Sequence, residues 1–387
     1  MYNILTLDKI SNLIFNELTD DKYVVNNEYN GSINQDAVIV RSRNMHEMQF
    51  DSNVLAIARA GAGVNTIPVK RCTEEGIVVF NTPGANANSV KEMVICAIIM
   101  GFRNVIESIE WTRSLKGQGE KVPELAEKGK KNFNGNEIKG KKIGILGLGA
   151  TGGLVAEAAL ALGMKVYGYD PYISVKNAWN LSNAVIMSSK EEILQSCDVV
   201  SIHIPLTKDT KDYIGKEEFS LMKDNVILLN FSRADLVDRG ELVNAFNNGK
   251  VHKYIVDFPT DDILCREKVI CLPHLASSTE ESENNCAIMA AKEIVNYLEN
   301  GSIENSVNFP SLVMQKNGEH RIAVIHKNEV GVINSITNIL RELNVNILNM
   351  RNVSNDDVAY SVFDTNKSID INKIATVEEV LKCRVIY

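Results

Sequence analysis

A glycine-rich turn joins a strand-like apolar run to a helix-like apolar run in KKIGILGLGATGGLVAEAALAL, residues 141–162. The pattern is G-x-G-x-x-G: the first glycine allows a tight turn, the second lets the backbone approach a pyrophosphate, and the third permits close packing of helix on strand. The helix N-terminus would then face the phosphates. Together these features predict the first βαβ unit of a dinucleotide-binding sheet, and a glycine turn without a ligand is the alternative. The residues expected to meet the dinucleotide here are Gly147, Gly149, Ala150, Thr151 and Gly152.

An acidic residue ends the next strand-like run, close to the spacing that this kind of sheet requires. The run MKVYGYD ends in Asp170, eighteen residues after Gly152. An acid near this position accepts hydrogen bonds from the adenosine ribose hydroxyls. Because its charge would repel a 2′-phosphate, we expect NAD as the cofactor rather than NADP.

Composition excludes several classes of protein and of site. The chain has 387 residues, enough for two or three domains with buried cores. Its net charge of −8 makes nucleic acid and anionic membranes poor partners, so an anionic ligand needs local arginines or helix N-termini. Seven scattered cysteines without a C-x-x-C pair indicate free thiols in the cytoplasm and no metal site. We see neither a secretion signal nor an apolar run of membrane-spanning length.

Alternating strand-like and helix-like runs divide the chain into three α/β domains. Two series of βα units predict two doubly wound parallel sheets: a flavodoxin-like domain over residues 1–90 and 284–312, and a Rossmann domain over 91–283. Residues 318–387 follow the order βαββαβ, which predicts a ferredoxin-like module whose second helix is DINKIATVEEVL. We interpret the lysine- and glycine-rich stretch that ends at Lys139 as a solvated connection.

Three segments outside the glycine turn carry a family resemblance. They are RAGAGVNTIPVKRCTEEGIVVFNTPG in the first domain, and NFSRADLVD and PHLASSTEE in the second. With GLGATG between them, the chain resembles the D-2-hydroxyacid dehydrogenase family over nearly its whole length. The resemblance implies that the first domain binds substrate and that the second binds NAD.

The resemblance also implies catalytic residues. The family's arginine corresponds to Arg233, whose planar guanidinium would pair with the substrate carboxylate and polarise the C2 oxygen. The family's histidine corresponds to His274, which would take the hydroxyl proton as hydride leaves. The family's aspartate at the nicotinamide corresponds to Asp257, and its glutamate five residues later to Asp262, one methylene shorter. Asp262 is thus the expected partner of His274, with Glu267 as a rival and a plain loop acid as the alternative.

Further cofactor and substrate contacts follow from the same resemblance. The additional cofactor contacts expected are His203, Pro205 and Ser232. The substrate contacts expected are Arg41, Arg43 and Arg59 for a phosphate, and the backbone of Gly61, Ala62 and Gly63 for a carboxylate. An ordinary surface position is the alternative for each arginine.

The C-terminal module resembles an ACT domain, a module that commonly pairs edge to edge and holds an amino acid at the seam. Under this resemblance HKNEVG supplies His326 and Asn328, and NVNIL supplies Asn346, as contacts for an L-serine effector. Val330 stands where the family usually has proline, which leaves this loop less rigid. A purely structural dimerisation module is the alternative.

The combined resemblance implies a function. It is the NAD-dependent oxidation of 3-phospho-D-glycerate to 3-phosphohydroxypyruvate, the first step of L-serine biosynthesis, in a homodimer or homotetramer. Two alternatives remain open. One is action on another 2-hydroxy acid, as in glyoxylate or hydroxypyruvate reductases, and the other is a non-catalytic NAD(H)-sensing protein. Retention of both Arg233 and His274 argues against the second alternative.

Overall fold

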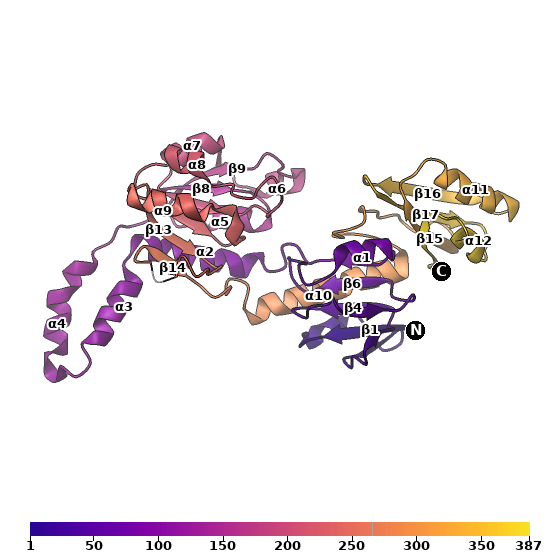
Figure 1. The fold of residues 1–387 in the computed structure, drawn as a ribbon, viewed down its shortest axis with the longest axis horizontal. Helices are drawn as coiled ribbons and strands as arrows, with labels where there is room; N and C mark the ends of the chain where they lie inside the picture. The colour runs from indigo at the N-terminus through magenta and orange to yellow at the C-terminus, as the bar shows by residue number, and fades with distance from the viewer. Residues whose placement is uncertain (265) are drawn as a thin grey trace. The chain divides into compact units, whose positions relative to one another are not determined.

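The computed structural model describes residues 1–264 and 266–387, so Cys265 lies outside the described residues. The chain divides into two compact units, one made of Met1–Asn86 with Glu280–Tyr387 and the other of Ala87–Thr279. Figure 1 shows their α/β architecture, and the two predicted doubly wound sheets and the ferredoxin-like module are all present. Both crossings between units lie four residues before the predicted ones, at 86 rather than 90 and at 279 rather than 283.

The first unit contains a five-stranded parallel sheet of flavodoxin-like order, β2-β1-β4-β6-β7. Its strands are β1 (Tyr2–Leu7), β2 (Tyr23–Asn26), β4 (Ala37–Val40), β6 (Ala56–Arg59) and β7 (Val78–Phe80); β3 (Ser32–Ile33) pairs with β5 (Gln49–Phe50). Helix α10 (Glu280–Asn300) packs on one face of the sheet, and α1 (Val69–Glu74) packs on the other. Burial on both faces explains why a strand such as AVIV is apolar throughout.

The second unit contains a seven-stranded parallel sheet of Rossmann order, β10-β9-β8-β11-β12-β13-β14. Its strands are β8 (Lys142–Leu146), β9 (Lys165–Tyr169), β10 (Ile186–Met187), β11 (Val199–Ile202), β12 (Val226–Asn230), β13 (Val251–Val256) and β14 (Val269–Cys271). One face is covered by α2 (Ala87–Phe102) and α5 (Ala150–Ala161). The other is covered by α7 (Lys190–Ser196), α8 (Lys216–Leu221) and α9 (Arg239–Asn247). The short α6 (Val175–Asn180) follows β9.

The stretch that ends at Lys139, which we expected to be a connection, is largely helical. It contains α3 (Val105–Ser114), η2 (Gly119–Lys121), α4 (Val122–Gly129) and η3 (Lys130–Phe133). The rings of Trp111 and Phe133 lie 5.4 Å apart, and Gly129 lies so close to Trp111 that a Cβ there would come within 2.1 Å of the indole. An aromatic contact between residues about twenty positions apart thus packs α3 on η3, in a stretch whose lysines and glycines we interpreted as a connection.

The C-terminal module has the ferredoxin-like strand order β16-β17-β15-β18, with antiparallel neighbours. Its elements are β15 (His320–Lys327), α11 (Val332–Glu342), β16 (Ile347–Ser354), β17 (Val358–Thr365), α12 (Asn372–Ala375) and β18 (Val380–Val385). The predicted helix over DINKIATVEEVL is therefore reduced to four residues. The reason is that Val380 already pairs with His326 in the sheet, so the last residues of that run belong to a strand.

Both faces of this module's sheet are buried, which follows from the period of two along a strand. On β15, Ile322 and Val324 face a small core that includes residues of α11 and α12. The alternating residues Ala323 and Ile325 join the core of the first unit, which contains α10. One face of the module's sheet therefore packs on the core that contains α10. The module is held by this packing as well as by the linker that precedes it.

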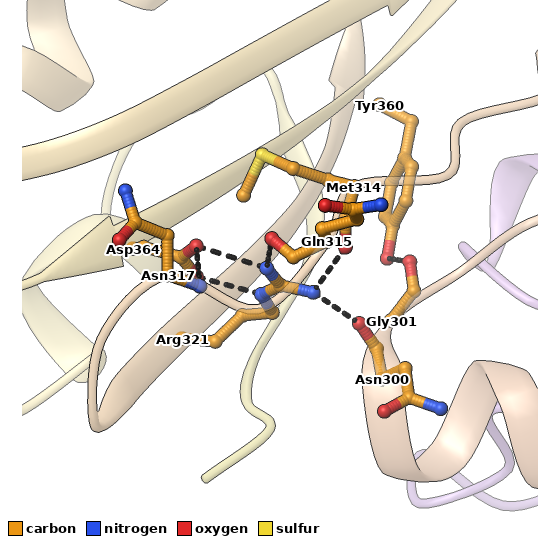
Figure 2. A network of polar contacts seen from close by, with 8 residues as sticks. All are labelled: Asn300, Gly301, Met314, Gln315, Asn317, Arg321, Tyr360 and Asp364. Atoms are coloured by element: carbon orange, nitrogen blue, oxygen red, sulfur yellow. Dashed lines mark hydrogen bonds and ion pairs between the residues drawn. The ribbon is translucent and has the colours of Figure 1, made fainter.

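A buried arginine connects the module to the end of α10 (Figure 2). Arg321 is 1% exposed, and Asp364, its partner at 2.7 Å, is fully buried. The guanidinium also donates to the carbonyl oxygens of Asn300, Met314 and Gln315 at 2.8 to 3.0 Å. The charged guanidinium thus donates to the last carbonyl of α10, where the helix dipole favours a cation. Its other two carbonyl partners belong to the linker.

Glu293 on α10 is a buried carboxyl group with an unusual titration. It is 5% exposed; Asn305 Nδ2 donates to its Oε1 at 2.9 Å, and no described group bonds its Oε2. Desolvation by burial raises its pKa from 4.5 to about 8. The pKa of this carboxyl group is higher in the folded than in the unfolded protein. The group therefore lowers the free energy of unfolding progressively as the pH rises between these two pKa values.

We therefore expect Glu293→Gln to stabilise the protein at neutral pH. A pKa unit corresponds to about 1.4 kcal/mol, so removing the ionisable group should add about 3 kcal/mol at pH 7 and little near pH 4.5. Denaturant unfolding at pH 5 and pH 8 would measure this, with the exposed Glu319→Gln of the same unit for comparison. A stabilisation that is equal at both pH values would contradict the proposed cause.

Two kinds of feature were searched for over the described residues. No helix within residues 1–264 and 266–387 is long and apolar enough to cross a membrane. In the same ranges, no group of three or more His, Cys, Asp or Glu side chains is placed to hold a metal ion.

Candidate active site

The glycine turn between β8 and α5 has a geometry that requires glycine at two positions. Gly147 has φ 95°, and a Cβ on it would lie 2.5 Å from the carbonyl oxygen of His203. A Cβ on Gly152 would lie 1.9 Å from the carbonyl oxygen of Gly147. At Gly149, by contrast, no described heavy atom lies within 4 Å of an added Cβ. The first and third glycines therefore serve the fold, while the space over the second is open to a ligand.

Asp170 is tied to this turn. Its Oδ2 accepts a hydrogen bond from Leu148 N, inside the turn, and its Oδ1 accepts one from Tyr172 N, both at 2.9 Å. A carboxylate can accept about four hydrogen bonds, so two further positions are left for ribose hydroxyls. Because Gly149 is the N-cap of α5 and has no side-chain cap bond, the first N–H groups of that helix are available to an anion. The turn and Asp170 together fit the pyrophosphate and ribose of NAD.

The predicted cofactor contacts all follow strand ends at one edge of the Rossmann sheet. Gly147, Asp170, His203 and Asp257 directly follow β8, β9, β11 and β13, and Ser232 comes two residues after β12. Carboxyl ends of parallel strands meet at the same edge, which is where ligands bind in open α/β sheets. The structure therefore brings these residues to one edge, as their positions predict.

Bonds to the protein orient the predicted contacts on β11 and β12. His203 Nε2 lies 2.8 Å from Ser201 Oγ, and desolvation lowers the pKa of His203 to about 4, so its imidazole is neutral at pH 7. The Ser232 hydroxyl donates to the carbonyl oxygen of Ile202 at 2.9 Å. The Pro205 carbonyl oxygen accepts from Thr210 Oγ1 at 2.7 Å. These bonds fix His203, Ser232 and Pro205 at this edge of the sheet. None of the three residues changes its charge near pH 7.

Arg233 and His274 lie against the same aromatic ring. The centroids of the Phe258 and His274 rings are 4.7 Å apart, and Arg233 Cζ lies 5.8 Å from the centroid of the Phe258 ring. Arg233 Nη1 donates to the carbonyl oxygen of Ser232 at 2.6 Å, and desolvation by burial lowers the pKa of Arg233, which still stays charged at neutral pH. A guanidinium and an imidazole thus lie close to one another, and these are groups that can pair with a carboxylate and accept a proton.

The backbone at His274 is strained. Its φ of 54° lies in the left-handed region, which non-glycine residues seldom adopt and which is often found at functional sites. The next two amides, Leu275 N and Ala276 N, donate to the two carboxylate oxygens of Asp257 at 2.7 and 2.9 Å. Asp257 is 1% exposed, and its carboxylate supports the His274 loop from within the protein. Its contact with the cofactor stays a prediction.

Asp262, the predicted partner of His274, bonds a cation in this structure. Arg239 Nη1 lies 3.5 Å from its Oδ1, and the Asp262 side chain is 46% exposed. The neighbouring Thr260 hydroxyl, and then the charge of Arg239, lower the pKa of Asp262. The carboxylate is therefore held on a solvent-facing cation, and its pairing with His274 stays a prediction. The rival, Glu267, is also exposed.

The predicted substrate arginines lie at the carboxyl edge of the first unit's sheet, and the structure joins two of them. Arg41 follows β4, and its carbonyl oxygen accepts a bond from Arg59 Nε at 3.0 Å, at the end of the neighbouring β6. The Arg41 guanidinium pairs with Glu283 at 2.7 Å. The Arg43 guanidinium instead pairs with the Asp8 carboxylate, with 3.2 Å between Nε and Oδ1. The backbone amide of Arg43 also donates to this carboxylate.

The predicted carboxylate loop lies next to these arginines. A Cβ on Gly61 would lie 2.0 Å from Arg59 Nη1, so glycine is what allows the guanidinium to fold over the loop. The carbonyl oxygen of Gly61 accepts from Thr82 N at 3.1 Å, and that of Ala62 accepts from Asn81 Nδ2 at 2.7 Å. Gly63 continues the same loop. The strand-end arginines and this braced loop thus lie at the same edge of the sheet, where their predicted role is to bind an anion.

The predicted effector residues are not brought together within one chain. His326 is 2% exposed, and its two ring nitrogens already bond the carbonyl oxygen of Lys327 and the hydroxyl of Ser361, which contradicts its role as an effector contact. The register places Asn328 and Asn346 at opposite ends of the sheet, about nine residues or roughly 30 Å apart at the usual strand rise. A single module therefore does not form the predicted serine site.

Sequence reasoning missed two residues that shape the catalytic edge. One is Phe258, which stands next to Asp257 and contacts both Arg233 and His274. The other is Asn230, fully buried, whose Nδ2 donates to the carbonyl oxygen of Arg233 at 2.8 Å and whose Oδ1 accepts from Ser232 N. A buried asparagine at the end of an apolar strand is the signal that could have identified the second, since it must bond nearby backbone.

Comparisons with known proteins agree with this geometry. The model of the D-isomer specific 2-hydroxyacid dehydrogenase NAD-binding domain matches residues 95–276. The chain is 31% identical over 355 residues to D-3-phosphoglycerate dehydrogenase of Haemophilus influenzae, covering 86% of this chain and 82% of that one. It is 29% identical over 413 residues to the enzyme of the same name from Dictyostelium discoideum, covering 99% of this chain and 97% of that one.

A solved structure is similar over most of the chain. It is NAD⁺-bound 3-phosphoglycerate dehydrogenase of Entamoeba histolytica, with a TM-score of 0.60 and 29% identity over 79% of this chain and 98% of that chain. The D-lactate dehydrogenase of Aquifex aeolicus, at 24% identity and a TM-score of 0.61, shares the fold. The glycine turn, Asp170, Arg233 and His274 lie in the unit that carries the family match. The chain therefore belongs to the D-isomer specific 2-hydroxyacid dehydrogenase family and is an NAD-dependent oxidoreductase.

Proposed function

We propose that this enzyme oxidises the C2 hydroxyl of 3-phospho-D-glycerate to give 3-phosphohydroxypyruvate. The observation that carries the proposal is the placement of Arg233 and His274 against one ring at the carboxyl edge of the NAD-binding sheet. NAD supplies the hydride acceptor. Arg233 holds the substrate carboxylate and polarises the C2 oxygen, and an imidazole nitrogen of His274 takes the hydroxyl proton as the C2–H bond breaks.

Recognition of the phosphate is assigned to the arginine edge of the first unit. Arg41 and Arg59 are joined through a hydrogen bond, and a chain with net charge −8 needs such local cations to attract a dianion. The phosphate would compete with Glu283 for Arg41. Because Arg43 is already bonded to Asp8 through its side chain and its backbone, we assign Arg43 a smaller part in binding the phosphate.

The proposal is tested by NADH formation from 3-phosphoglycerate, D-glycerate and D-lactate, compared by kcat/KM. A preference for 3-phosphoglycerate supports it. A preference for D-glycerate would favour a glyoxylate or hydroxypyruvate reductase type of enzyme. NADH binding without turnover of any of the three would favour the NAD(H)-sensing alternative.

The arginine assignment predicts a loss that depends on the phosphate. Arg41→Gln should lower kcat/KM for 3-phosphoglycerate by about 10-fold or more relative to D-glycerate, since a charge-assisted hydrogen bond contributes about 1.5–3 kcal/mol. Arg43→Gln should act in the same direction and less strongly. Lys70→Gln, which removes an exposed lysine of α1, controls for the change in net charge. Equal losses for both substrates would assign Arg41 to structure or to the carboxylate.

Asp170 predicts the choice of cofactor. NAD should be preferred over NADP, because the Asp170 carboxylate accepts ribose hydroxyls and repels a 2′-phosphate. Asp170→Ala should lower the ratio of kcat/KM with NAD to kcat/KM with NADP, and it should weaken the binding of NAD. Since Asp170 also bonds Leu148 N, Asp170→Asn is the matched variant that keeps an acceptor and removes the charge. Equal use of both cofactors by the unaltered enzyme would refute the assignment.

We also propose that the C-terminal module pairs with a second copy and holds L-serine only when paired. Strand β16 is an edge of the sheet, and the other edge, β18, carries Lys382, which bonds carbonyl oxygens at Ser52 and Val54. If two β16 strands pair antiparallel about a two-fold axis, the Asn346 end of one chain meets the Asn328 end of the other. This pairing would form in a homodimer the site that one chain lacks.

Calorimetry with L-serine and sedimentation test this proposal together. Serine binding that is lost with Asn346→Ala, in a protein that remains dimeric, supports the paired site. A dimer that binds no serine would leave the module as an oligomerisation element. A monomer that binds serine would refute the pairing requirement.

A further inference from the structure

A small pocket lies where helix α10 meets the linker that leads to the C-terminal module. Its volume is about 180 Å³, which is room for one small organic molecule. Residues three and four apart on α10 form one wall, and the linker directly after the helix forms the other. Its lining includes Met289, Lys292 and Glu293 from the helix, and Ser302, Glu304 and Asn305 from the linker. Among the residues that the structure describes, those lining this pocket include none that we assign to the cofactor, the substrate or L-serine.

Glu293 gives the pocket a buried oxygen atom without a partner. The residue is 5% exposed, and Asn305 Nδ2 donates to its Oε1 at 2.9 Å. Its Oε2 is also buried, and no described group forms a hydrogen bond with it. Buried polar atoms are normally bonded, because an unpaired one retains its full cost of desolvation. An oxygen of this kind in the wall of a pocket therefore marks a place for a hydrogen-bond donor.

The charges around the pocket favour a donor that is also a cation. Desolvation raises the pKa of Glu293 to about 8, and the charge of Glu304 on the linker adds to this rise. Lys292 is the cation on the helix wall, and its Nζ lies 3.6 Å from the carboxylate of Glu17, outside the lining. Two carboxyl groups thus interact at the pocket, while the nearby lysine has an acidic partner elsewhere. A bound positive charge would relieve the repulsion between Glu293 and Glu304.

We propose that this pocket binds a small organic cation, an ammonium group on a short carbon chain, with Glu293 Oε2 as its main acceptor. An ammonium group has three donors, so it can use the Ser302 hydroxyl and the Glu304 carboxylate as well. Met289 supplies an apolar wall for the carbon chain. A divalent metal ion fits less well, because Ca²⁺ takes about six to eight oxygen ligands. Over the described ranges, no three His, Cys, Asp or Glu side chains are grouped to hold a metal ion.

Binding of the cation should be coupled to release of a proton. The pKa of about 8 keeps most Glu293 carboxyl groups protonated at neutral pH, whereas the cation binds the charged form. The apparent Kd is the intrinsic Kd divided by the fraction of protein in the competent form. Because that fraction rises with pH, we expect the Kd to fall by about 10-fold or more between pH 6 and pH 8.

The experiment is calorimetric titration of the full-length enzyme with ethylamine hydrochloride at pH 6, 7 and 8, in buffers of different ionisation enthalpy. The unaltered enzyme and Glu319→Gln, which removes an exposed charge of the same unit, should bind ethylamine saturably and release a proton at pH 7. Glu293→Gln should fold, since it removes a buried charge and keeps the shape of the side chain. It should lose about 10-fold or more in affinity, together with the dependence on pH, because a hydrogen bond to a charged group contributes strongly.

Two further probes test the chemical class of the ligand. Tetramethylammonium keeps the charge and has no N–H donor, so it should bind about 10-fold or more weakly than ethylamine. Calcium chloride tests for a metal site, and Ca²⁺ should not displace ethylamine.

Four results would overturn the proposal. Absence of saturable ethylamine binding at millimolar concentrations would leave Glu293 as a buried carboxyl group of the fold. Equal binding by Glu293→Gln would place the amine elsewhere on the protein. Equal binding of tetramethylammonium would mean that charge alone is recognised, and displacement by Ca²⁺ would make the pocket a metal site. Neither NAD nor substrate takes part in this binding, so its outcome is independent of the proposed function.

Discussion

His274→Ala is expected to slow turnover of 3-phosphoglycerate by a factor on the order of 10²–10⁴, the range for loss of a positioned general base. Arg233→Lys should also be severe, because an ammonium group cannot replace a planar fork that pairs with a carboxylate. Stopped-flow or steady-state NADH formation measures both. NADH binding should be preserved in both variants, since the glycine turn and Asp170 hold the other half of the cofactor.

His252→Ala is the matched control for the histidine, because His252 lies on β13 of the same unit and has an exposed side chain. It should keep native kcat. Near-native activity in His274→Ala or Arg233→Lys would contradict the assignment of the catalytic pair. A loss in all three variants would point to a general effect on the fold.

Arg321→Met is expected to give the largest loss of stability. The substitution leaves Asp364 fully buried without its cation and breaks bonds to three backbone carbonyls, and breaking a buried ion pair in this way costs about 3–5 kcal/mol. Because those carbonyls belong to α10 and the linker, we expect the C-terminal module to come loose first. Denaturant unfolding would show the loss, and limited proteolysis would show cleavage within residues 300–318.

Two variants control for this effect. Lys128→Met breaks an exposed ion pair with Glu124 and should cost no more than about 0.5 kcal/mol. The double change Arg321→Met with Asp364→Leu removes both charges and should recover part of the loss, since an unpaired buried charge is the main cost. An Arg321→Met protein that unfolds like the native one would show that the network does not hold the module.

Much of this fold (Figure 1) could be predicted from local patterns. Apolar runs such as AVIV and VVSI are buried on both faces in parallel sheets, and their alternation with helices predicts a doubly wound order. The predictions that failed concern segments whose structure depends on distant partners. The α3–α4 segment folds on the Trp111–Phe133 contact, and the end of the predicted 370–381 helix pairs with β15 instead.

The edge location of the site was determined by residue order alone. Gly147, Asp170, His203 and Asp257 each follow a strand directly, and parallel strands must place their carboxyl ends at one edge. Nothing in residue order says which way a side chain turns once it is there. Tertiary packing decided that Asp257 bonds the His274 loop, that Asp262 pairs with Arg239, and that Phe258 contacts both Arg233 and His274.

The same distinction holds for the C-terminal module. Its βαββαβ order was readable because the period of apolar residues changes between strand and helix. The burial of Arg321 was not readable, since arginine is mostly exposed and its sequence position carries no sign of burial. Only the packing of the second sheet face on α10 encloses the guanidinium and supplies its carbonyl partners, because burial depends on which surfaces meet and not on the local order of residues.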